Sequence, residues 1–180
     1  MPDTIETSTS ESTAEMTPVT ISPSELVRRA QSLVPMIRER QKETEANGRV
    51  SAEIFGAIRD AEIFKILLPR RYGGFEYGLD TFAEVGFEIA RGCGSVGWVN
   101  SVTAMYHVFL GMYPERAQDD VWGENPGAVL AASFTPTGTV TPVDGGYSLT
   151  GKWMFCSGVD NCAWTIVGVT IPAAVEGEPD

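Results

Sequence analysis

Three short segments place small residues and hydroxyl groups beside aromatic rings, a combination that suits a flat, polar ligand. The first is residues 94–98, Gly-Ser-Val-Gly-Trp, at the start of an apolar helical stretch. Small residues at a helix N-terminus let a ligand approach the free backbone N–H groups closely, and Trp98 can stack on a planar ring. A capped core helix whose tryptophan only packs has the same pattern, so spacing alone leaves both interpretations open.

The second segment is residues 131–138. A strand-like stretch that contains Ser133 and Phe134 leads into a loop of threonine, proline and glycine. The amides and hydroxyls of such a loop suit a phosphate group or the polar edge of a ring. A solvated β-turn has the same composition, and the residues do not decide between the two.

The third segment is residues 151–158, in which Trp153 and Phe155 alternate with smaller side chains before Cys156 and Ser157. An aromatic floor beside small hydrogen-bonding groups is one way to hold a flavin ring. The alternative is a hairpin strand whose aromatic side chains belong to the core.

His107 is the single histidine of the chain and lies in an apolar helical stretch. One histidine excludes a multi-histidine metal site, and no G-x-S-x-G motif presents a serine nucleophile. A packed histidine bonded to a backbone group and a histidine that faces a substrate both fit this pattern.

Composition and charge exclude several functional classes. The 24 Asp and Glu residues outnumber the 13 Lys and Arg residues, for a formal net charge of −11, which argues against binding of nucleic acid through its phosphates. No apolar run approaches the roughly 18–20 residues of a membrane span, so we expect no membrane association. Three cysteines cannot all pair within one chain, and no charged-then-apolar leader precedes the acidic N-terminus; we therefore expect a reducing, cytoplasmic location.

The elements that must position these residues fall into two parts, preceded by a tail. Residues 1–21 contain too few large apolar groups to offset the entropy of ordering, so we expect a disordered acidic tail. Residues 22–124 show helical periodicity and predict a helical domain. Its helices are expected to begin at Ser22-Pro23, Ser51, Asp80, Ser95 and Pro114, with a kink or break at Pro35 and a C-cap at Asn47-Gly48.

Residues 125–180 change in character, because glycine, threonine and valine increase and the period falls toward two. The sequence predicts an antiparallel β segment with a hairpin turn at residues 144–146, and the whole is an α+β pattern. The strands are expected at residues 128–134, 139–143, 146–150, 153–156 and 164–170. Such a sheet keeps open edges, so we expect the chain to be incomplete at its C-terminus or to be completed by another chain.

Two stretches together resemble the acyl-CoA dehydrogenase superfamily. Residues 147–158 are similar to the middle-domain strand pair that lies against the flavin, and Leu68-Pro69 with Tyr72-Gly73-Gly74 is similar to a loop of the helical domain. The resemblance covers roughly residues 25–172. It implies an N-terminal all-α domain, the start of an antiparallel β-barrel-like middle domain, and the absence of the C-terminal helical bundle that completes the flavin site and forms the tetramer interface.

Within that superfamily the three segments look most like the oxygenase subunits of two-component flavin monooxygenases. Acyl-CoA dehydrogenases usually carry Thr-Glu-Pro and then Ala-Gly-Ser after the equivalent strand, whereas residues 134–139 read Phe-Thr-Pro-Thr-Gly-Thr. The resemblance implies that reduced FMN or FAD from a separate flavin reductase reacts with O2 to form a C4a-hydroperoxyflavin, which hydroxylates a phenolic or other aromatic substrate. It also implies a homo-oligomer for the full-length protein.

The resemblance also implies roles for individual residues. Ser157 is the expected hydrogen-bond partner of flavin N5, with Cys156 as the alternative if the register shifts by one. Trp98, Phe134, Trp153 and Phe155 are expected to form an apolar shell, which excludes water. Ser133 is expected near the ring or the substrate hydroxyl, and His107 near the substrate phenol.

Two other functions stay open at this stage. An acyl-CoA dehydrogenase would use FAD to oxidise a CH–CH bond of an acyl thioester. A non-catalytic fragment or partner subunit would keep the helical domain only to bind a longer homologue.

Overall fold

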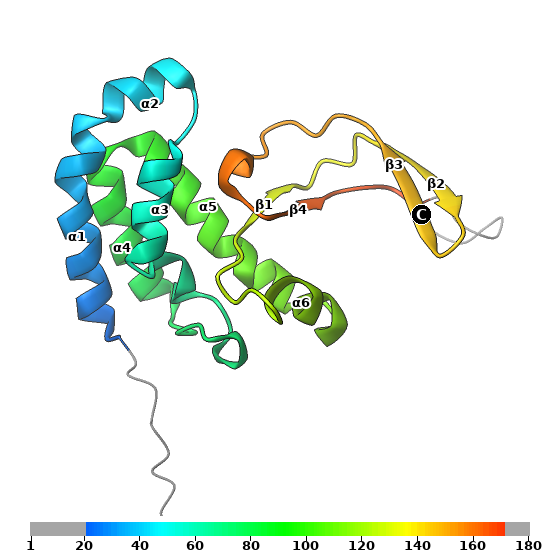
Figure 1. The fold of residues 1–180 in the computed structure, drawn as a ribbon, viewed down its shortest axis with the longest axis horizontal. Helices are drawn as coiled ribbons and strands as arrows, with labels where there is room; N and C mark the ends of the chain where they lie inside the picture. Colours follow the sequence, from blue (N-terminus) through cyan, green and yellow to red (C-terminus); the bar gives the residue numbers. More distant parts are fainter. Residues whose placement is uncertain (1–20, 172–180) are drawn as a thin grey trace, which may run out of the picture.

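The computed structural model describes residues 21–171, and within that range helices come first and short strands follow (Figure 1). The predicted tail, residues 1–21, lies outside the described residues apart from Ile21. The helices are α1 (Pro23–Glu39), α2 (Gln41–Asn47), α3 (Ala52–Asp60), α4 (Leu79–Gly92), α5 (Gly94–Gly111) and α6 (Glu115–Trp122), with 3-10 turns η1 (Ile63–Ile66), η2 (Arg70–Tyr72) and η3 (Val159–Asn161). The strands are β1 (Leu130–Ser133), β2 (Thr139–Val143), β3 (Gly146–Thr150) and β4 (Trp164–Val167).

Local signals in the sequence set the ends of α1, α2 and α3. Ser22 caps α1 and accepts a hydrogen bond from the backbone N–H of Glu25 at 3.2 Å, and Ser51 caps α3 in the same way. Gly48 ends α2 in the left-handed conformation, with φ of 61°, which glycine adopts at little cost. Of the kink or break expected at Pro35, the break does not occur, because α1 continues through this residue and ends at Glu39.

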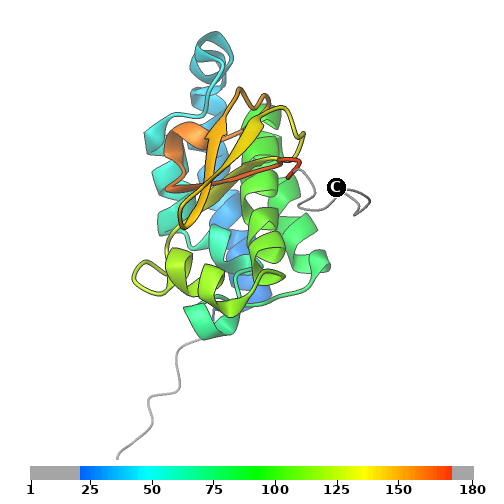
Figure 2. The same ribbon diagram turned by 90° about the vertical axis from the view of Figure 1, so that its right-hand side faces the viewer.

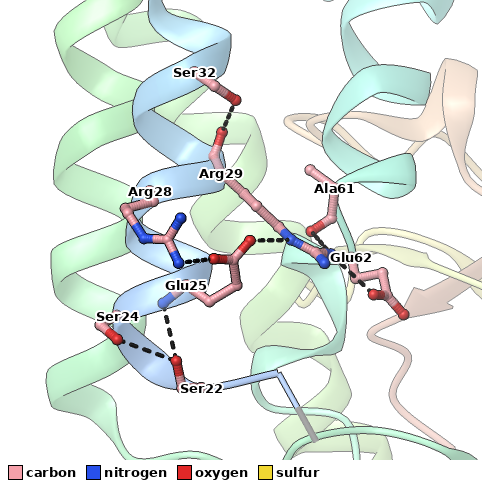
Figure 3. A network of polar contacts seen from close by, with 8 residues as sticks. All are labelled: Ser22, Ser24, Glu25, Arg28, Arg29, Ser32, Ala61 and Glu62. Carbon is pink, nitrogen blue, oxygen red and sulfur yellow. Dashed lines mark hydrogen bonds and ion pairs between the residues drawn. The ribbon is translucent and has the colours of Figure 1, made fainter. Parts of the chain in front are cut away.

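An ionic network joins α1 to the end of α3 (Figure 3). The guanidinium of Arg29 donates to Glu25 at 3.1 Å and to Glu62 at 3.0 Å, and it also reaches the carbonyl oxygen of Ala61 at 3.3 Å. These carboxylates raise the pKa of Arg29 above its ordinary value, mainly through the hydrogen bond that Arg29 donates to Glu25. The network fixes the position at which η1 begins. The apolar side chains of η1 lie in the core.

The starts of α4 and α5 differ from the prediction by one or two residues. Gly78 and Cys93 are the N-cap residues, so Asp80 and Ser95 lie inside the first turns and do not cap their helices. Asp80 still lies at the positive end of the α4 dipole, where a carboxylate is favourable. Cys93 is extended, with φ of −159°, and this single residue reverses the chain between the two helices.

The hydrophobic core lies mainly between helices, and one side of α5 is buried in it. Buried side chains of α1, α3, η1, α4 and α5 form one cluster, and a second cluster joins α5 and α6 to β1. Although α5 is largely apolar, it is not buried on every face, because Trp98 is 63% exposed and Met112, which caps its C-terminus, is 73% exposed. One apolar face of α5 therefore stays open.

The strands form two separate two-stranded sheets within the described residues. β2 and β3 form the predicted antiparallel hairpin, with Val143 opposite Gly146. β1 and β4 pair in parallel, with Leu130 opposite Trp164, so the prediction of an all-antiparallel segment is wrong. Figure 1 shows the β2–β3 hairpin extending away from the helices, and Figure 2, viewed from that side, shows it in front of them. β1 lies next to α5.

The predicted strand at residues 153–156 is absent from the structure. Phe155 has φ of 58°, which is incompatible with an extended strand. Trp153 instead donates from Nε1 to the carbonyl oxygen of Gly168 at 2.7 Å. The segment is thus a loop that packs beside β4.

Within residues 21–171, the helices are all too short or too polar to cross a membrane.

Candidate functional site

The N-terminal part of α5 meets the loop that follows Trp153. Trp98 Nε1 donates to Ser157 Oγ at 3.4 Å, across 59 residues of sequence. Trp98 projects from α5 because its neighbours Val96 and Gly97 are buried against the helical core. The Ser157 hydroxyl accepts this bond and keeps its own proton and a second lone pair for another partner.

A groove of about 230 Å³ lies beside this contact. Its walls come from residues 48–50, between α2 and α3, from Val99 of α5, and from residues 155–158, 160 and 161. Asn161 holds two walls together, because its side-chain amide donates to the carbonyl oxygen of Val50 at 3.0 Å. A second groove of about 280 Å³ continues from the same residues to Ser95.

Two residues of the predicted flavin-binding segment line this groove with different surfaces. Phe155 is 90% exposed, and Cys156 is half-buried with a free thiol. Burial raises the pKa of the Cys156 thiol above its ordinary value, so the group is a neutral thiol at pH 7. The groove thus offers an aromatic surface, a hydroxyl and a thiol in consecutive positions.

Ser133 lies under the loop and does not face the groove. Its side chain is 6% exposed, and Oγ donates to the carbonyl oxygen of Met154 at 2.7 Å. Ser133 therefore ties β1 to the residue just before Phe155. This bond occupies the hydroxyl that the resemblance assigns to the ring or the substrate.

Phe134 lies further along the exposed face of α5. Its ring is half-exposed and contacts Phe109 at a centroid distance of 5.1 Å and Tyr106 at 6.0 Å. These side chains extend the apolar surface from β1 onto α5. Trp153, also expected in the shell, instead packs its indole against Gly138 and Gly151.

His107 lies on the opposite side of α5. Nine residues separate it from Trp98, which corresponds to a rotation of about 180° around the helix. Its ring is 1% exposed, and Nε2 donates to the carbonyl oxygen of Ala128 at 3.3 Å. Burial lowers the pKa of His107 to about 4, so the ring is neutral at pH 7.

A small cavity of about 30 Å³ lies beside His107, and residues of η1 and residues 126–129 line it. Among residues 21–171, no group forms a hydrogen bond with His107 Nδ1. This cavity shares no lining residue with the groove at Ser157. The structure therefore brings together Trp98, Phe155, Cys156 and Ser157, and it places His107 elsewhere.

Two features of the site were missed by the sequence analysis. The wall at residues 48–50 was interpreted only as a helix end, and no sequence signal connects it to residues 155–161. Tyr106, next to His107, is the α5 residue that faces β1, where its hydroxyl lies 3.5 Å from the carbonyl oxygen of Ala132. Helical periodicity counted from Trp98 favours Tyr106 over His107 for the side of α5 that faces β1. The sequence therefore did contain a signal for this placement.

The residues present fit a flat, conjugated cofactor such as a flavin. Trp98 and Phe155 offer exposed aromatic surfaces, and the Ser157 hydroxyl, which accepts the Trp98 bond, can also bond a ring nitrogen or oxygen. The cationic side chain of the groove, Arg49, lies 3.8 Å from Asp160. To a ring, the groove thus offers shape and hydrogen-bonding groups more than it offers charge.

Comparisons with known proteins show the family of the chain. The family described as "Acyl-CoA dehydrogenase, N-terminal domain" matches residues 26–122. The FADH(2)-dependent resorcinol hydroxylase, oxygenase component, of Rhizobium sp. is 36% identical over 86% of this chain and 38% of its own length. The flavin-dependent monooxygenase oxygenase subunit HsaA of Mycobacterium tuberculosis is 37% identical over 82% of this chain and 37% of its own length.

Solved structures show the same fold. The 3-HSA hydroxylase of Rhodococcus sp. RHA1 superimposes with a TM-score of 0.79 and 33% identity, over 87% of this chain and 40% of the other. XiaF from Streptomyces sp., in complex with FADH2 and glycerol, gives a TM-score of 0.77 and 30% identity, over 81% of this chain and 37% of the other.

Fold and groove together define an acyl-CoA dehydrogenase-like helical domain followed by small sheets. The chain belongs to the acyl-CoA dehydrogenase N-terminal domain family. The relatives it matches include oxygenase subunits of flavin-dependent monooxygenases. The chain spans about two fifths of the length of these curated relatives.

Proposed function

We propose that this chain is part of the oxygenase component of a two-component, reduced-flavin-dependent monooxygenase that hydroxylates a phenolic or other aromatic substrate. The contact between Trp98 and Ser157 at the edge of the groove carries the proposal. It presents a hydroxyl beside the exposed Trp98 ring and two residues after the exposed Phe155, an arrangement that suits a flavin ring. The relatives are named as oxygenase components of flavin-dependent hydroxylases and monooxygenases, which supports the same reaction class.

When bound, the reduced flavin supplies the two electrons that activate O2. The chain's own residues position the ring and exclude water. Ser157 hydrogen-bonds the N5 edge of the ring, with Cys156 as its neighbour on the same wall. Trp98, Phe155 and Phe134 supply apolar surface, which protects a water-sensitive reaction.

The proposal extends to the cofactor, partner and assembly. The cofactor would be FMN or FAD, because the residues named above address only the ring that both flavins share, and a separate flavin reductase would deliver it in reduced form. We propose a homotetramer for the whole protein, with the helical domain at residues 22–124 and a barrel-like middle domain that begins near residue 125. The free thiols of Cys93, Cys156 and Cys162 agree with a cytoplasmic location.

Product analysis with labelled oxygen tests the reaction. The chain is mixed with chemically reduced FMN or FAD, a simple phenol such as resorcinol, and O2 enriched in heavy oxygen. One labelled oxygen atom in a hydroxylated product, in excess over a flavin-only control and lost in Ser157→Ala, supports the proposal. Label found only in peroxide and water contradicts it.

The exposed apolar face of α5 favours a second candidate, a partner subunit of a longer homologue. Trp98 and Met112 are the most exposed side chains of this face. A partner subunit would bury them in a stable complex and bind no flavin alone. An acyl-CoA dehydrogenase, in contrast, would bind oxidised FAD and bleach it on addition of an acyl-CoA.

A further inference from the structure

The groove beside the proposed flavin ring continues into a second groove, which we call the extension. The two grooves share residues 48–50 and Val99, and the extension, of about 280 Å³, reaches Thr44, Glu45 and Ser95. It therefore lies between α2 and the start of α5, which contact each other. None of the residues assigned to the flavin ring lines the extension, so the proposed function leaves it unused.

Thr44 presents a hydroxyl to the extension. The residue is only 4% exposed, and among residues 21–171 no group forms a hydrogen bond with its hydroxyl. The side-chain atoms that are both sealed from solvent and unpartnered belong to other residues, so the Thr44 hydroxyl is reached from the groove that it lines. A nearly buried hydroxyl without a partner is unfavourable, and a polar ligand group in the extension would satisfy it.

The charged side chains of the two grooves carry more negative than positive charge. Glu45 lines the extension, and Gln41 holds its carboxylate by donating from Nε2 to Oε1 at 2.7 Å. Arg49 lines both grooves, but its guanidinium lies 3.8 Å from the carboxylate of Asp160. The two carboxylates therefore exceed the one guanidinium by a unit of charge.

The N-terminus of α5 does not reverse this balance. Ser95 lies in the first turn of α5, where the helix dipole contributes about half a positive charge. A phosphate or carboxylate in the extension would thus meet net repulsion, which disfavours the phosphate-bearing chain of a flavin. A hydroxyl or an ammonium group would instead find acceptors in the Glu45 carboxylate and in the hydroxyls of Thr44 and Ser95.

We propose that the extension is a substrate-specificity pocket, which receives the end of the substrate remote from the ring that is hydroxylated. It selects an elongated phenol whose far end carries a hydroxyl or an ammonium group, and it disfavours a phenol that ends in a carboxylate. Thr44 bonds this end, and Glu45 sets the preferred charge. The proposal deepens the proposed function and rests on it, since it takes the bound phenol to be the substrate.

Three phenols with one skeleton test the preferred charge. Tyrosol, tyramine and 3-(4-hydroxyphenyl)propionate differ only in the group that follows two methylenes: a hydroxyl, an ammonium or a carboxylate. NMR titration of the isotope-labelled chain without flavin, at low ionic strength, follows the backbone amides of Thr44 and Ser95. We expect tyrosol and tyramine to bind about fivefold more tightly than the propionate. The preference for tyramine should shrink in about 0.5 M salt, because these charges are exposed and screened.

Two substitutions assign the preference to its residues. Glu45→Gln keeps the shape and removes the charge, so the ratio of tyramine to propionate affinity should fall by about threefold. Thr44→Val keeps the shape and removes the hydroxyl, so tyrosol should bind about fivefold more weakly. Glu43→Gln changes an exposed carboxylate of the same helix that does not line the extension, and this control should match the wild type in both measurements.

The possible results separate the pocket from the reaction. Wild-type binding of the propionate that equals or exceeds that of tyramine refutes the charge selection, and so does a preference that Glu45→Gln leaves unchanged. If no phenol shifts the amides of Thr44 and Ser95, the pocket is refuted, even if the labelled-oxygen experiment detects hydroxylation. If the phenols bind there with the expected order but no hydroxylation occurs, the pocket stands as a phenol site and the proposed function fails.

Discussion

The indole Nε1 of Trp98 and the hydroxyl of Ser157 lie 3.4 Å apart although 59 residues separate them in the chain. One belongs to a helix that the core fixes, and the other to a loop that β1 and β4 position. The bond therefore lies at the junction between the helical part and the strand-rich part. The proposed flavin site depends on this junction.

Removal of the Ser157 hydroxyl should weaken flavin binding and leave folding nearly unchanged. The hydroxyl makes one long hydrogen bond at a half-exposed position, which contributes little to stability. We expect Ser157→Ala to lower the affinity for reduced flavin by about tenfold, equivalent to about 1.4 kcal/mol. Ser148→Ala, at an exposed position of β3, is the control and should change neither property. Equal affinities for Ser157→Ala and wild type in an anaerobic fluorescence titration would refute the role.

Ser133 should matter for stability more than for binding chemistry. Its buried hydroxyl satisfies the carbonyl oxygen of Met154, and an unsatisfied buried group costs about 1–3 kcal/mol. Ser133→Ala should lower the free energy of unfolding by about that amount. Thr137→Val, which removes an exposed bond to the carbonyl oxygen of Lys152, should cost less than about 0.5 kcal/mol. Urea unfolding curves measure both values, and a smaller loss at Ser133 than at Thr137 would contradict the assignment.

His107 should make the fold sensitive to acid. Its folded pKa of about 4 lies below the ordinary value of about 6.5, so the unfolded chain binds the proton first as pH falls. Stability from this group is complete above about pH 6.5 and is lost progressively toward pH 4, by on the order of 3 kcal/mol. We expect His107→Gln to remove this part of the pH dependence, as measured by urea unfolding from pH 7.5 to 4.

The same variant tests the role that the resemblance implies for His107. A neutral histidine on the buried side of α5 positions Ala128 and does not reach the groove. Loss of hydroxylation in a His107→Gln protein whose stability at pH 7.5 matches wild type would support the substrate-facing role, and unchanged hydroxylation would contradict it.

Gly168 fixes the distance between β4 and Phe134. A Cβ at this position would collide with the backbone carbonyl of Phe134, and the N–H of Gly168 donates to the carbonyl oxygen of Ser133 at 2.8 Å. We expect Gly168→Ala to destabilise the chain by about 1–3 kcal/mol, the usual cost of a forced backbone shift. Gly146→Ala has open space around it and should fall within about 0.5 kcal/mol of wild type. Equal melting temperatures for the two variants would show that β4 can move without cost.

Local sequence signals predicted much of the helical part. Ser22, Ser51 and Gly48 lie where the structure places their caps, because each position is decided by one or two neighbouring residues. The hairpin between β2 and β3 is local in the same sense. The exposed side of α5 was also implicit in helical periodicity, since Trp98 and His107 cannot share one face.

Long-range features were not predictable from such signals. The parallel pairing of β1 with β4 joins segments more than thirty residues apart in the register Leu130 opposite Trp164, and no hairpin signal marks it. The strand predicted at residues 153–156 fails because the Phe155 backbone is set by contacts from Ser133 and α5. Tertiary contacts decided both cases against local propensity.

The most direct test of the account is an anaerobic titration of the chain with reduced and oxidised FMN and FAD, followed by tryptophan fluorescence in the wild type and in Trp98→Phe. We predict that the reduced form of one flavin binds at least about tenfold more tightly than its oxidised form, and that part of the quenching disappears with the Trp98 indole. Binding of neither flavin, or tighter binding of oxidised FAD that bleaches with an acyl-CoA, would contradict the proposed function.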